Sequence, residues 1–372
     1  MEYKNILIIK MSSLGDVLHT LPFAAALRER FPRAKISWLV HPQFAGFVPD
    51  APVIDEVIYF DKVAFNKMGL FKKLKFIYKF RKELHSKHFD LVIDMQGLFK
   101  SALVAFLTGT KEKIGYCEMR EGSFLVSKAI CGANSKEHVI ERYLDVARYL
   151  GAEIKEIKFP MPNLRKENQS VRAKLKASGR NIPSYVVFVV GARWESKEWS
   201  PSNFAKLADL VCDEETYVVL AGGPDEIKKG EEVIAKAKTK KIINLIGQTS
   251  LRELASLING AKVFISGDTG PLHVAAALKK PLIALYGPTL ADRTGPYGSE
   301  KSTVIISPSL DAGSLKKKLA ETKSMEAITV EMVFKAYQKT IEKIEKAKEN
   351  ESIIERKPII RKSKNKNKWL KK

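Results

Sequence analysis

The stretch NILIIKMSSLGDVLHTLPFAAALRERF, residues 5–31, determines the fold class. Ile6–Ile9 is an uninterrupted apolar run of the kind that forms buried parallel strands. The polar loop Ser12–Asp16 follows it, and we expect a helix from Val17 to Phe31 that ends before Pro32. A strand, a loop and a helix in this order begin a βαβ unit, which predicts a parallel sheet.

The alternation of strands and helices occurs twice along the chain. In the first half we expect strands at residues 6–9, 35–40, 56–60 and 91–94. The pattern restarts after Pro160 and Pro162, with strands expected at residues 185–190, 217–220, 241–245, 263–265 and 282–285. The sequence therefore predicts an α/β protein with two Rossmann-like domains.

The predicted units are an N-terminal domain, a C-terminal domain, a final helix and a basic tail, at residues 1–160, 161–330, 331–350 and 351–372. Ligands of open parallel sheets bind beyond the carboxyl ends of the strands. With two such sheets, we expect the binding site in the cleft between the domains.

Positive charge dominates the composition, because 64 Lys and Arg face 42 Asp and Glu, for a net charge of +22. Such an excess favours anionic partners. The segment Arg356–Lys372 has nine basic residues and no acid, and we expect it to be a solvated, disordered tail. The alternative is a contact with a membrane surface or a nucleic acid, and Trp369-Leu370 among the lysines favours the membrane. The segment Lys62–Lys87 has nine basic residues, one acid and apolar residues at helical spacing. Two interpretations stay open for it: a helix on an anionic membrane surface, or an ordinary packed helix with a solvated basic face.

The cysteines and the apolar runs indicate the compartment. Cys117, Cys131 and Cys212 are too few and too widely spaced for a disulfide framework or a zinc site, so we expect buried thiols. No apolar run reaches the ~18–20 residues of a membrane span. The first residues also lack the pattern of a signal peptide. We therefore expect a cytoplasmic protein.

Two loops at the ends of predicted strands carry charged side chains. In the first loop, Asp16 is either a helix cap or a carboxylate that faces the cleft as a general base. In the second loop, Gly191–Trp199, the side chains of Arg193 and Lys197 either reach a phosphate or are simply solvated.

The loop Ser266–His273 lies between a predicted strand and a helix that we expect to start at Pro271. The backbone amides of Thr269 and Gly270 then face the positive end of the helix dipole, which suits a diphosphate. His273 is either a packed or capping histidine or a catalytic one. There is no D-x-D sequence and no cluster with metal-ligand spacing, so we expect phosphate charge to be met by Lys, Arg and helix ends, without a metal.

Residues 10–22, KMSSLGDVLHTLP, resemble the opening of the lipopolysaccharide heptosyltransferases, glycosyltransferase family 9, and are most similar to heptosyltransferase I. Residues 266–277, SGDTGPLHVAAA, and 286–289, YGPT, resemble the donor-site segment of that family. The resemblance extends in order from Ile6 to about Tyr297. It implies a GT-B fold, in which the N-terminal domain binds the acceptor and the C-terminal domain binds ADP-heptose. The implied reaction is inverting transfer of L-glycero-D-manno-heptose to the Kdo region of Kdo2-lipid A.

The resemblance also implies roles for particular residues. Asp16 corresponds to the family's general base and Lys197 to its donor-phosphate lysine. The other implied donor-binding residues are Arg193, Asp268, Thr269, Gly270, His273 and either Asp225 or Glu226, which the sequence does not separate. The implied acceptor-side residues are Ser12, Ser13, Gly15, Arg120 and His138. Gly191-Ala192 departs from the family, which commonly has small hydroxylated residues there.

Alternatives to this function remain at the level of the sequence. Heptosyltransferase II, which adds the second heptose, or another family member that acts on a later core acceptor, would differ from this enzyme only in the contacts to the acceptor. A two-domain binding protein without catalysis is a rival from another class. For the enzyme, the expected partners are ADP-heptose, a lipopolysaccharide core acceptor and the anionic cytoplasmic face of the inner membrane, with no nucleic acid.

Overall fold

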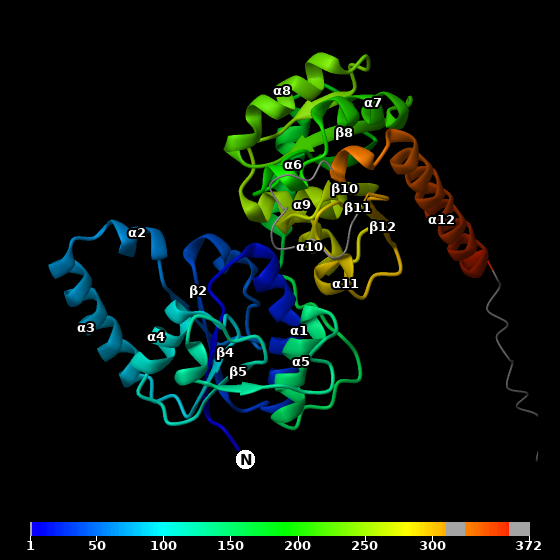
Figure 1. Cartoon of the computed structure of the whole chain (residues 1–372). Coiled ribbons are helices and arrows are strands. Elements are labelled where there is room, and N and C mark those ends of the chain that lie inside the picture. Colours follow the sequence, from blue (N-terminus) through cyan, green and yellow to red (C-terminus); the bar gives the residue numbers. More distant parts are fainter. Residues whose placement is uncertain (1, 310–323, 357–372) are drawn as a thin grey trace, which may run out of the picture.

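The computed structural model describes residues 2–309 and 324–356 of the chain. It contains two parallel six-stranded sheets, one in each domain (Figure 1). The N-terminal sheet has the order β3-β2-β1-β4-β5-β6, and the C-terminal sheet has the order β12-β11-β10-β7-β8-β9. Both are the 3-2-1-4-5-6 order of the Rossmann fold. The predicted fold class, α/β with two Rossmann-like domains that face a cleft, is confirmed.

The strands of the N-terminal sheet are β1 Asn5–Ile9, β2 Lys35–Val40, β3 Glu56–Tyr59, β4 Leu91–Asp94, β5 Lys113–Tyr116 and β6 Lys128–Ile130. Those of the C-terminal sheet are β7 Ser184–Val189, β8 Thr216–Ala221, β9 Ile242–Asn244, β10 Val263–Gly267, β11 Leu282–Tyr286 and β12 Ser302–Ile306. The residues Ile6–Ile9 of β1 are fully buried, as the apolar run predicts.

The helices of the N-terminal domain are α1 Leu14–Arg30, α2 Lys62–Lys67, α3 Leu70–Ser86, α4 Phe99–Leu107 and α5 Val139–Tyr149. Those of the C-terminal domain are α6 Arg165–Lys176, α7 Pro201–Val211, α8 Ile227–Lys236, α9 Leu251–Gly260, α10 Gly270–Ala277, α11 Ala291–Thr294 and α12 Val330–Arg356. The helix α12 packs on α7 and β12 and then extends away from the domain (Figure 1). The tail was predicted at residues 351–372, but α12 extends to Arg356, and the rest of the predicted tail lies outside the described residues. In the described part of the chain, no helix is long and apolar enough to cross a membrane.

The order of the strands fixes where loops from distant parts of the sequence meet. In the N-terminal sheet the strand order reverses between β1 and β4, and in the C-terminal sheet it reverses between β7 and β10. These reversals open a crevice at the carboxyl edge of each sheet. The loops that follow β1, β7 and β10 are the three that the sequence singles out.

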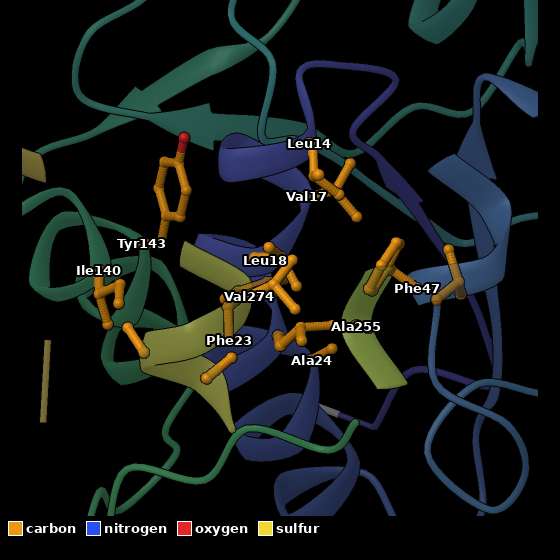
Figure 2. Close-up of a cluster of buried hydrophobic side chains, with 14 of the residues drawn as sticks. Leu14, Val17, Leu18, Phe23, Ala24, Phe47, Ile140, Tyr143, Ala255 and Val274 are labelled. Atoms are coloured by element: carbon orange, nitrogen blue, oxygen red, sulfur yellow. The ribbon is translucent and has the colours of Figure 1, made fainter. Parts of the chain in front are cut away.

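One apolar core runs through both domains. The helix α1 packs against α5 of its own domain and against α10 of the other domain. Figure 2 shows side chains from both domains in this cluster, among them Leu18 from α1, Val274 from α10 and Ala255 from α9. Apolar burial therefore holds the two domains against each other as well as stabilising each one.

Two helices have other boundaries in the structure than the sequence predicts. The helix α1 begins at Leu14 instead of Val17, because Ser13 occupies the N-cap position and Asp16 lies in the first turn. The basic segment forms two helices, α2 and α3, separated at Met68 and Gly69.

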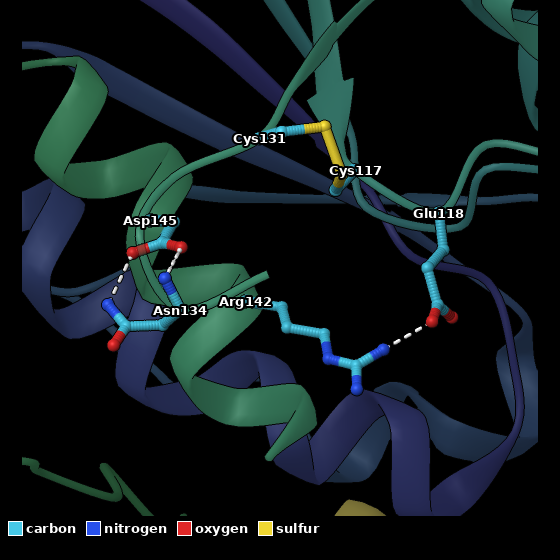
Figure 3. Close-up of a disulfide and its surroundings, with 6 residues drawn as sticks. All are labelled: Cys117, Glu118, Cys131, Asn134, Arg142 and Asp145. Carbon is cyan, nitrogen blue, oxygen red and sulfur yellow. Dashed lines mark hydrogen bonds and ion pairs between the residues drawn. A yellow bond between two sulfur atoms is a disulfide. The ribbon is translucent and has the colours of Figure 1, made fainter. Parts of the chain in front are cut away.

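The expectation of three free thiols is wrong. Cys117 and Cys131 form a disulfide, with a distance of 4.6 Å between their Cα atoms, and Cys212 is free (Figure 3). Tyr116 of β5 is paired with Ile130 of β6, so the cysteines that follow them lie side by side. The spacing of 14 residues in the sequence does not reveal this pairing.

We predict that the disulfide contributes to stability. Under non-reducing conditions, the double variant Cys117→Ser/Cys131→Ser is expected to lose up to about 3 kcal/mol of unfolding free energy, because a loop of this length is no longer closed in the unfolded chain. Urea denaturation measures the loss. In dithiothreitol the two proteins should unfold alike, and equal stability without reductant would contradict the prediction.

Candidate functional site

A cavity of about 600 Å³ lies between the carboxyl edges of the two sheets. The N-terminal domain contributes residues from the start of α1 and from the segment after β2. The C-terminal domain contributes the loops after β7, β8 and β10. Ten of the predicted site residues line it: Ser13, Gly15, Asp16, Arg193, Lys197, Glu226, Asp268, Thr269, Gly270 and His273.

The Asp16 carboxylate both caps α1 and faces the cavity. Its Oδ2 atom accepts hydrogen bonds from the backbone N–H of Ser13, at 2.9 Å, and from the hydroxyl of Ser13, at 2.8 Å. The side chain is nevertheless 41% exposed, on the side that lines the cavity. The two interpretations of this residue from the sequence are therefore compatible: the bonds from Ser13 hold the carboxylate in place, and the side chain still lines the cavity.

A buried lysine lies beneath this carboxylate. The Lys10 Nζ atom donates to the backbone oxygen of Met95, at 2.8 Å, and to the hydroxyl of Tyr143, at 2.7 Å. It lies 3.8 Å from the Asp16 Oδ1 atom. Burial opposes the ionisation of Asp16, but the charge of Lys10 and the two bonds from Ser13 outweigh it and lower the pKa of Asp16. The carboxylate is therefore ionised at neutral pH.

On the opposite wall, Lys197 is held by Asp268. The Lys197 Nζ atom lies 2.6 Å from the Asp268 Oδ2 atom, and both side chains are largely buried. Burial favours the neutral acid, yet the charge of Lys197 and its hydrogen bond lower the pKa of Asp268. Lys197 therefore presents a fixed positive charge to the cavity.

Two helices begin at this cavity, one from each domain. Thr269 is the N-cap residue of α10, which starts at Gly270, and Ser13 is the N-cap residue of α1. The positive ends of both helix dipoles, with their free backbone N–H groups, face the same space. Together with Lys197 and Arg193, they form a site suited to a diphosphate.

Only one of the two adjacent acids lines the cavity. Asp225 is exposed and does not line the cavity, whereas Glu226 does. A Cβ atom at Gly191 would lie 2.3 Å from the Glu226 Cδ atom, and one at Gly222 would lie 1.9 Å from its Oε2 atom. The carboxyl group thus occupies a space that only glycine leaves open at these two positions. Burial, the largest effect, raises the pKa of Glu226.

Three histidines meet where the domains touch. The His19 Nε2 atom of α1 lies 3.2 Å from the His273 Nδ1 atom of α10. The His138 Nε2 atom donates to the backbone oxygen of Gly295, at 3.0 Å, and its ring stacks on Tyr297. Burial lowers the pKa of all three histidines, in the case of His138 to about 4. These rings are therefore neutral at pH 7 and act as contacts between the domains.

Four predicted site residues do not line the cavity: Ser12, Arg120, His138 and Asp225. Ser12 donates its backbone N–H to the Gln96 Oε1 atom. Arg120 is exposed in the loop after β5. Its neighbour Glu118 is the residue that pairs with buried Arg142 (Figure 3), and it also pairs with Arg293 of the other domain.

Two residues that matter to the site were missed as candidates. Lys10 stands at the end of an apolar strand, where a lysine is seldom buried without a partner, and that position was the available signal. His19 lies in the first quoted motif, but its partner is 254 residues away in the sequence. In residues 2–309 and 324–356, no group of three or more His, Cys, Asp or Glu side chains could hold a metal ion.

Comparisons with known proteins agree on one family. A sequence model described as glycosyltransferase family 9 (heptosyltransferase) matches residues 77–326. The chain is 30% identical over 301 residues to lipopolysaccharide heptosyltransferase 1 of Escherichia coli K12, covering 80% of this chain and 92% of that protein. It is 29% identical to lipopolysaccharide heptosyltransferase 2 of the same strain, over 81% of this chain and 87% of that protein. The structure of the E. coli heptosyltransferase WaaC with ADP is similar, with a TM-score of 0.70 and 25% identity, over 90% of this chain and 99% of that chain.

We predict a pH dependence of stability from the buried His138. An unfolded histidine binds a proton near pH 6.5, whereas folded His138 does so only near pH 4. Lowering the pH from 7 to 5 therefore favours the unfolded chain, by about 2 kcal/mol for this residue. Urea unfolding at both pH values is expected to show a smaller loss in His138→Gln, which keeps a donor for Gly295. An identical loss in the two proteins would contradict the assignment.

Proposed function

The chain belongs to glycosyltransferase family 9 and is a heptosyltransferase of lipopolysaccharide core biosynthesis, and we propose that it transfers L-glycero-D-manno-heptose from ADP-heptose to the Kdo region of Kdo2-lipid A. The observation that carries this proposal is a single cavity with an ionised, accessible Asp16 on one wall and a fixed lysine with a helix N-terminus on the other. A transfer reaction needs a base for the acceptor and a positive site for the leaving group. The cavity provides one from each domain.

The C-terminal wall suits the donor. Lys197 and the N-terminus of α10 stabilise the negative charge of the diphosphate. This charge increases on ADP as the bond to the sugar breaks. Glu226, in its glycine-lined space, is placed to accept hydrogen bonds from the ribose hydroxyls. Asp268 is positioned to contact the heptose while it orients Lys197. Arg193 adds a further positive charge at the same wall.

The N-terminal wall suits the acceptor. Asp16 takes the proton from the attacking hydroxyl as that oxygen bonds to the anomeric carbon and ADP leaves. The displacement is direct, so one base is sufficient and the configuration inverts. Lys10 keeps Asp16 ionised for this step, and the cap from Ser13 fixes its direction. Arg120 lies outside the cavity, on an exposed loop of the same domain, where it suits a phosphate or carboxylate at the far end of a large acceptor.

The decisive experiment combines the purified protein, ADP-heptose and Kdo2-lipid A in EDTA, with ADP release and the mass of the acceptor as readouts. The expected result is a gain of one heptose, with no need for a metal. Transfer only to an already heptosylated acceptor would move the assignment to a heptosyltransferase II or a later enzyme. ADP binding without transfer to either acceptor would overturn the proposed reaction.

We also place the protein at the anionic cytoplasmic face of the inner membrane. In α3 the side chains of Phe71, Leu74 and Tyr78 are 87%, 56% and 71% exposed, among six Lys and Arg of the same helix. A helix with exposed aromatic residues and many lysines is typical of a membrane-surface contact. Co-sedimentation with phosphatidylglycerol vesicles is expected, and it should fall in Phe71→Ser/Tyr78→Ser. Equal partition of the variant and the parent would contradict this role of α3.

Loss of the base should slow turnover without weakening donor binding. Asp16→Asn is expected to reduce kcat by ~10²–10⁴, the usual contribution of a general base. Calorimetry should show ADP affinity near that of the parent protein. Asp50→Asn, an exposed site in the same domain, is the matched control and should keep full activity. Normal turnover of Asp16→Asn would remove Asp16 from the mechanism.

Loss of the donor-site lysine should weaken binding itself. Lys197→Ala is expected to reduce ADP affinity roughly 10- to 150-fold, because a charge-assisted contact worth about 1.5–3 kcal/mol is lost. Lys228→Ala, which removes an exposed lysine that does not line the cavity, is the control and should bind ADP normally. Equal affinities in the two variants would show that Lys197 does not contact the diphosphate.

A further inference from the structure

A second cavity, of about 170 Å³, lies in the N-terminal domain between α2, α3 and α4. These helices lie together on one side of the domain, away from α1 and α5 (Figure 1). None of its lining residues lines the cleft between the domains. The proposed transfer reaction therefore gives this cavity no role.

The walls of this cavity are apolar. Four phenylalanines in mutual contact form one wall, with neighbouring ring centroids 5.5–6.0 Å apart: Phe60, Phe65, Phe76 and Phe80. The residues of α4 form the opposite wall: Phe99, Leu103, Val104 and Leu107. Phe99 is 60% and Leu103 is 39% exposed, so this wall continues to the protein surface.

The polar lining consists of Lys62, Asn66 and Lys100. Lys62 begins α2 and Lys100 lies in the first turn of α4, and both lysines are exposed at the mouth of the cavity. Neither forms an ion pair with a carboxylate within residues 2–309 and 324–356. Partial burial and the charge of Lys62 lower the pKa of Lys100, although the nearby Glu121 carboxylate opposes this shift, so the two ammonium groups still repel each other. An anion between them relieves that repulsion.

A ligand for this site needs an apolar end and one anionic head. An apolar cavity of about 150 Å³ in another protein holds a benzene molecule, so this one has room for about six carbon atoms. A helix of a partner protein, about 10 Å across, does not fit such a space. We propose that the cavity holds the end of one acyl chain of an anionic membrane lipid, whose headgroup lies between Lys62 and Lys100.

This site deepens the membrane contact proposed for α3. The helices α3 and α4 also carry exposed apolar residues, of which Phe99 and Leu103 line the cavity: Leu70, Phe71, Leu74, Phe99, Leu103 and Phe106. Lysines on α3 attract the anionic surface without selecting a molecule. The cavity adds a specific position for a single lipid. The inference rests on the proposed membrane location but not on the transfer reaction, which the test below leaves out.

The first test is calorimetry with butyl, hexyl and octyl phosphate, each below its micelle concentration. Affinity is expected to rise about fourfold per methylene group up to about six carbons and then to level off, because further methylenes extend beyond the cavity. Octyl glucoside, which is neutral, should bind at least tenfold more weakly than octyl phosphate. No binding at millimolar concentration, or a rise that continues past six carbons, would overturn the proposal.

Variants locate the site. Lys62→Gln/Lys100→Gln should bind octyl phosphate about tenfold more weakly, whereas Lys72→Gln/Lys75→Gln, which removes the same charge from exposed positions of α3, should bind normally. Leu103→Trp, which fills the mouth, should abolish binding; the lysine pairs give the answer alone if this variant does not fold. Equal losses in the two lysine pairs would reduce the effect to general surface charge and overturn the site.

A third experiment tests whether the bound acyl chain belongs to a membrane lipid. Vesicles of phosphatidylglycerol with a photoreactive group on one acyl chain are irradiated with the full-length protein, and labelled peptides are mapped by mass spectrometry. Labels in residues 60–80 and 99–107 are expected, and they should disappear in Lys62→Gln/Lys100→Gln. Binding of octyl phosphate without such labels would assign the cavity to a free single-chain amphiphile and overturn the membrane-lipid assignment.

Discussion

The close approach of two helix N-termini, one from each domain, is the constraint on which the rest of the structure depends. A Cβ atom at Gly15 of α1 would lie 2.6 Å from the His273 Cδ2 atom of α10. A Cβ atom at Gly270 would lie 3.1 Å from the side chain of Leu14. The missing side chains let the helices meet, and this contact places Asp16 opposite Lys197 across one cavity. A single methyl group at Gly15 would push the two walls of the site apart.

Charge inside the site is arranged in two separate pairs. Lys10 is fully buried and satisfied by Met95 and Tyr143, so it holds Asp16 ionised from below without reaching the cavity itself. Lys197 reaches the cavity and is held by Asp268. Lys10 thus keeps the base ionised, whereas Lys197 binds an anion. The two lysines differ in role because they differ in burial: only Lys197, which lines the cavity, can contact a ligand.

The sequence predicts the parts of the fold that local patterns determine. The apolar run of β1 is predicted correctly, because burial on both faces of a parallel sheet leaves a continuous signal. The helix after it was predicted as well, but with its start three residues too late. The strands β5, β6 and β12 were not predicted: β5 (KIGY) and β6 (KAI) each begin with a lysine and lack three consecutive large apolar residues, and in β12 (STVII) only Ile305 is buried. The disulfide follows from the pairing of β5 with β6, and it was missed together with those strands.

In the candidate site too, the features that follow from local sequence patterns were predicted, and those that depend on long-range contacts were not. The loop residues are recognisable because each follows a strand, and ten of them line the cavity. The position of His138 depends on how the two domains dock, because its ring contacts Gly295 and Tyr297 of the other domain, and no local pattern records this docking. The contact of His19 with His273 has the same origin.

The shared core also governs how the molecule can be dissected. Because α1 packs on α10, and apolar side chains of both domains such as Leu18 and Ala255 share one cluster, cutting the chain between the domains would leave both fragments with an open apolar face. Each half has a complete Rossmann sheet, and by topology alone it resembles an independent folding unit. Its solubility nevertheless depends on the other half. The two domains are therefore better regarded as one product to be expressed, purified and crystallised intact than as modules to be exchanged.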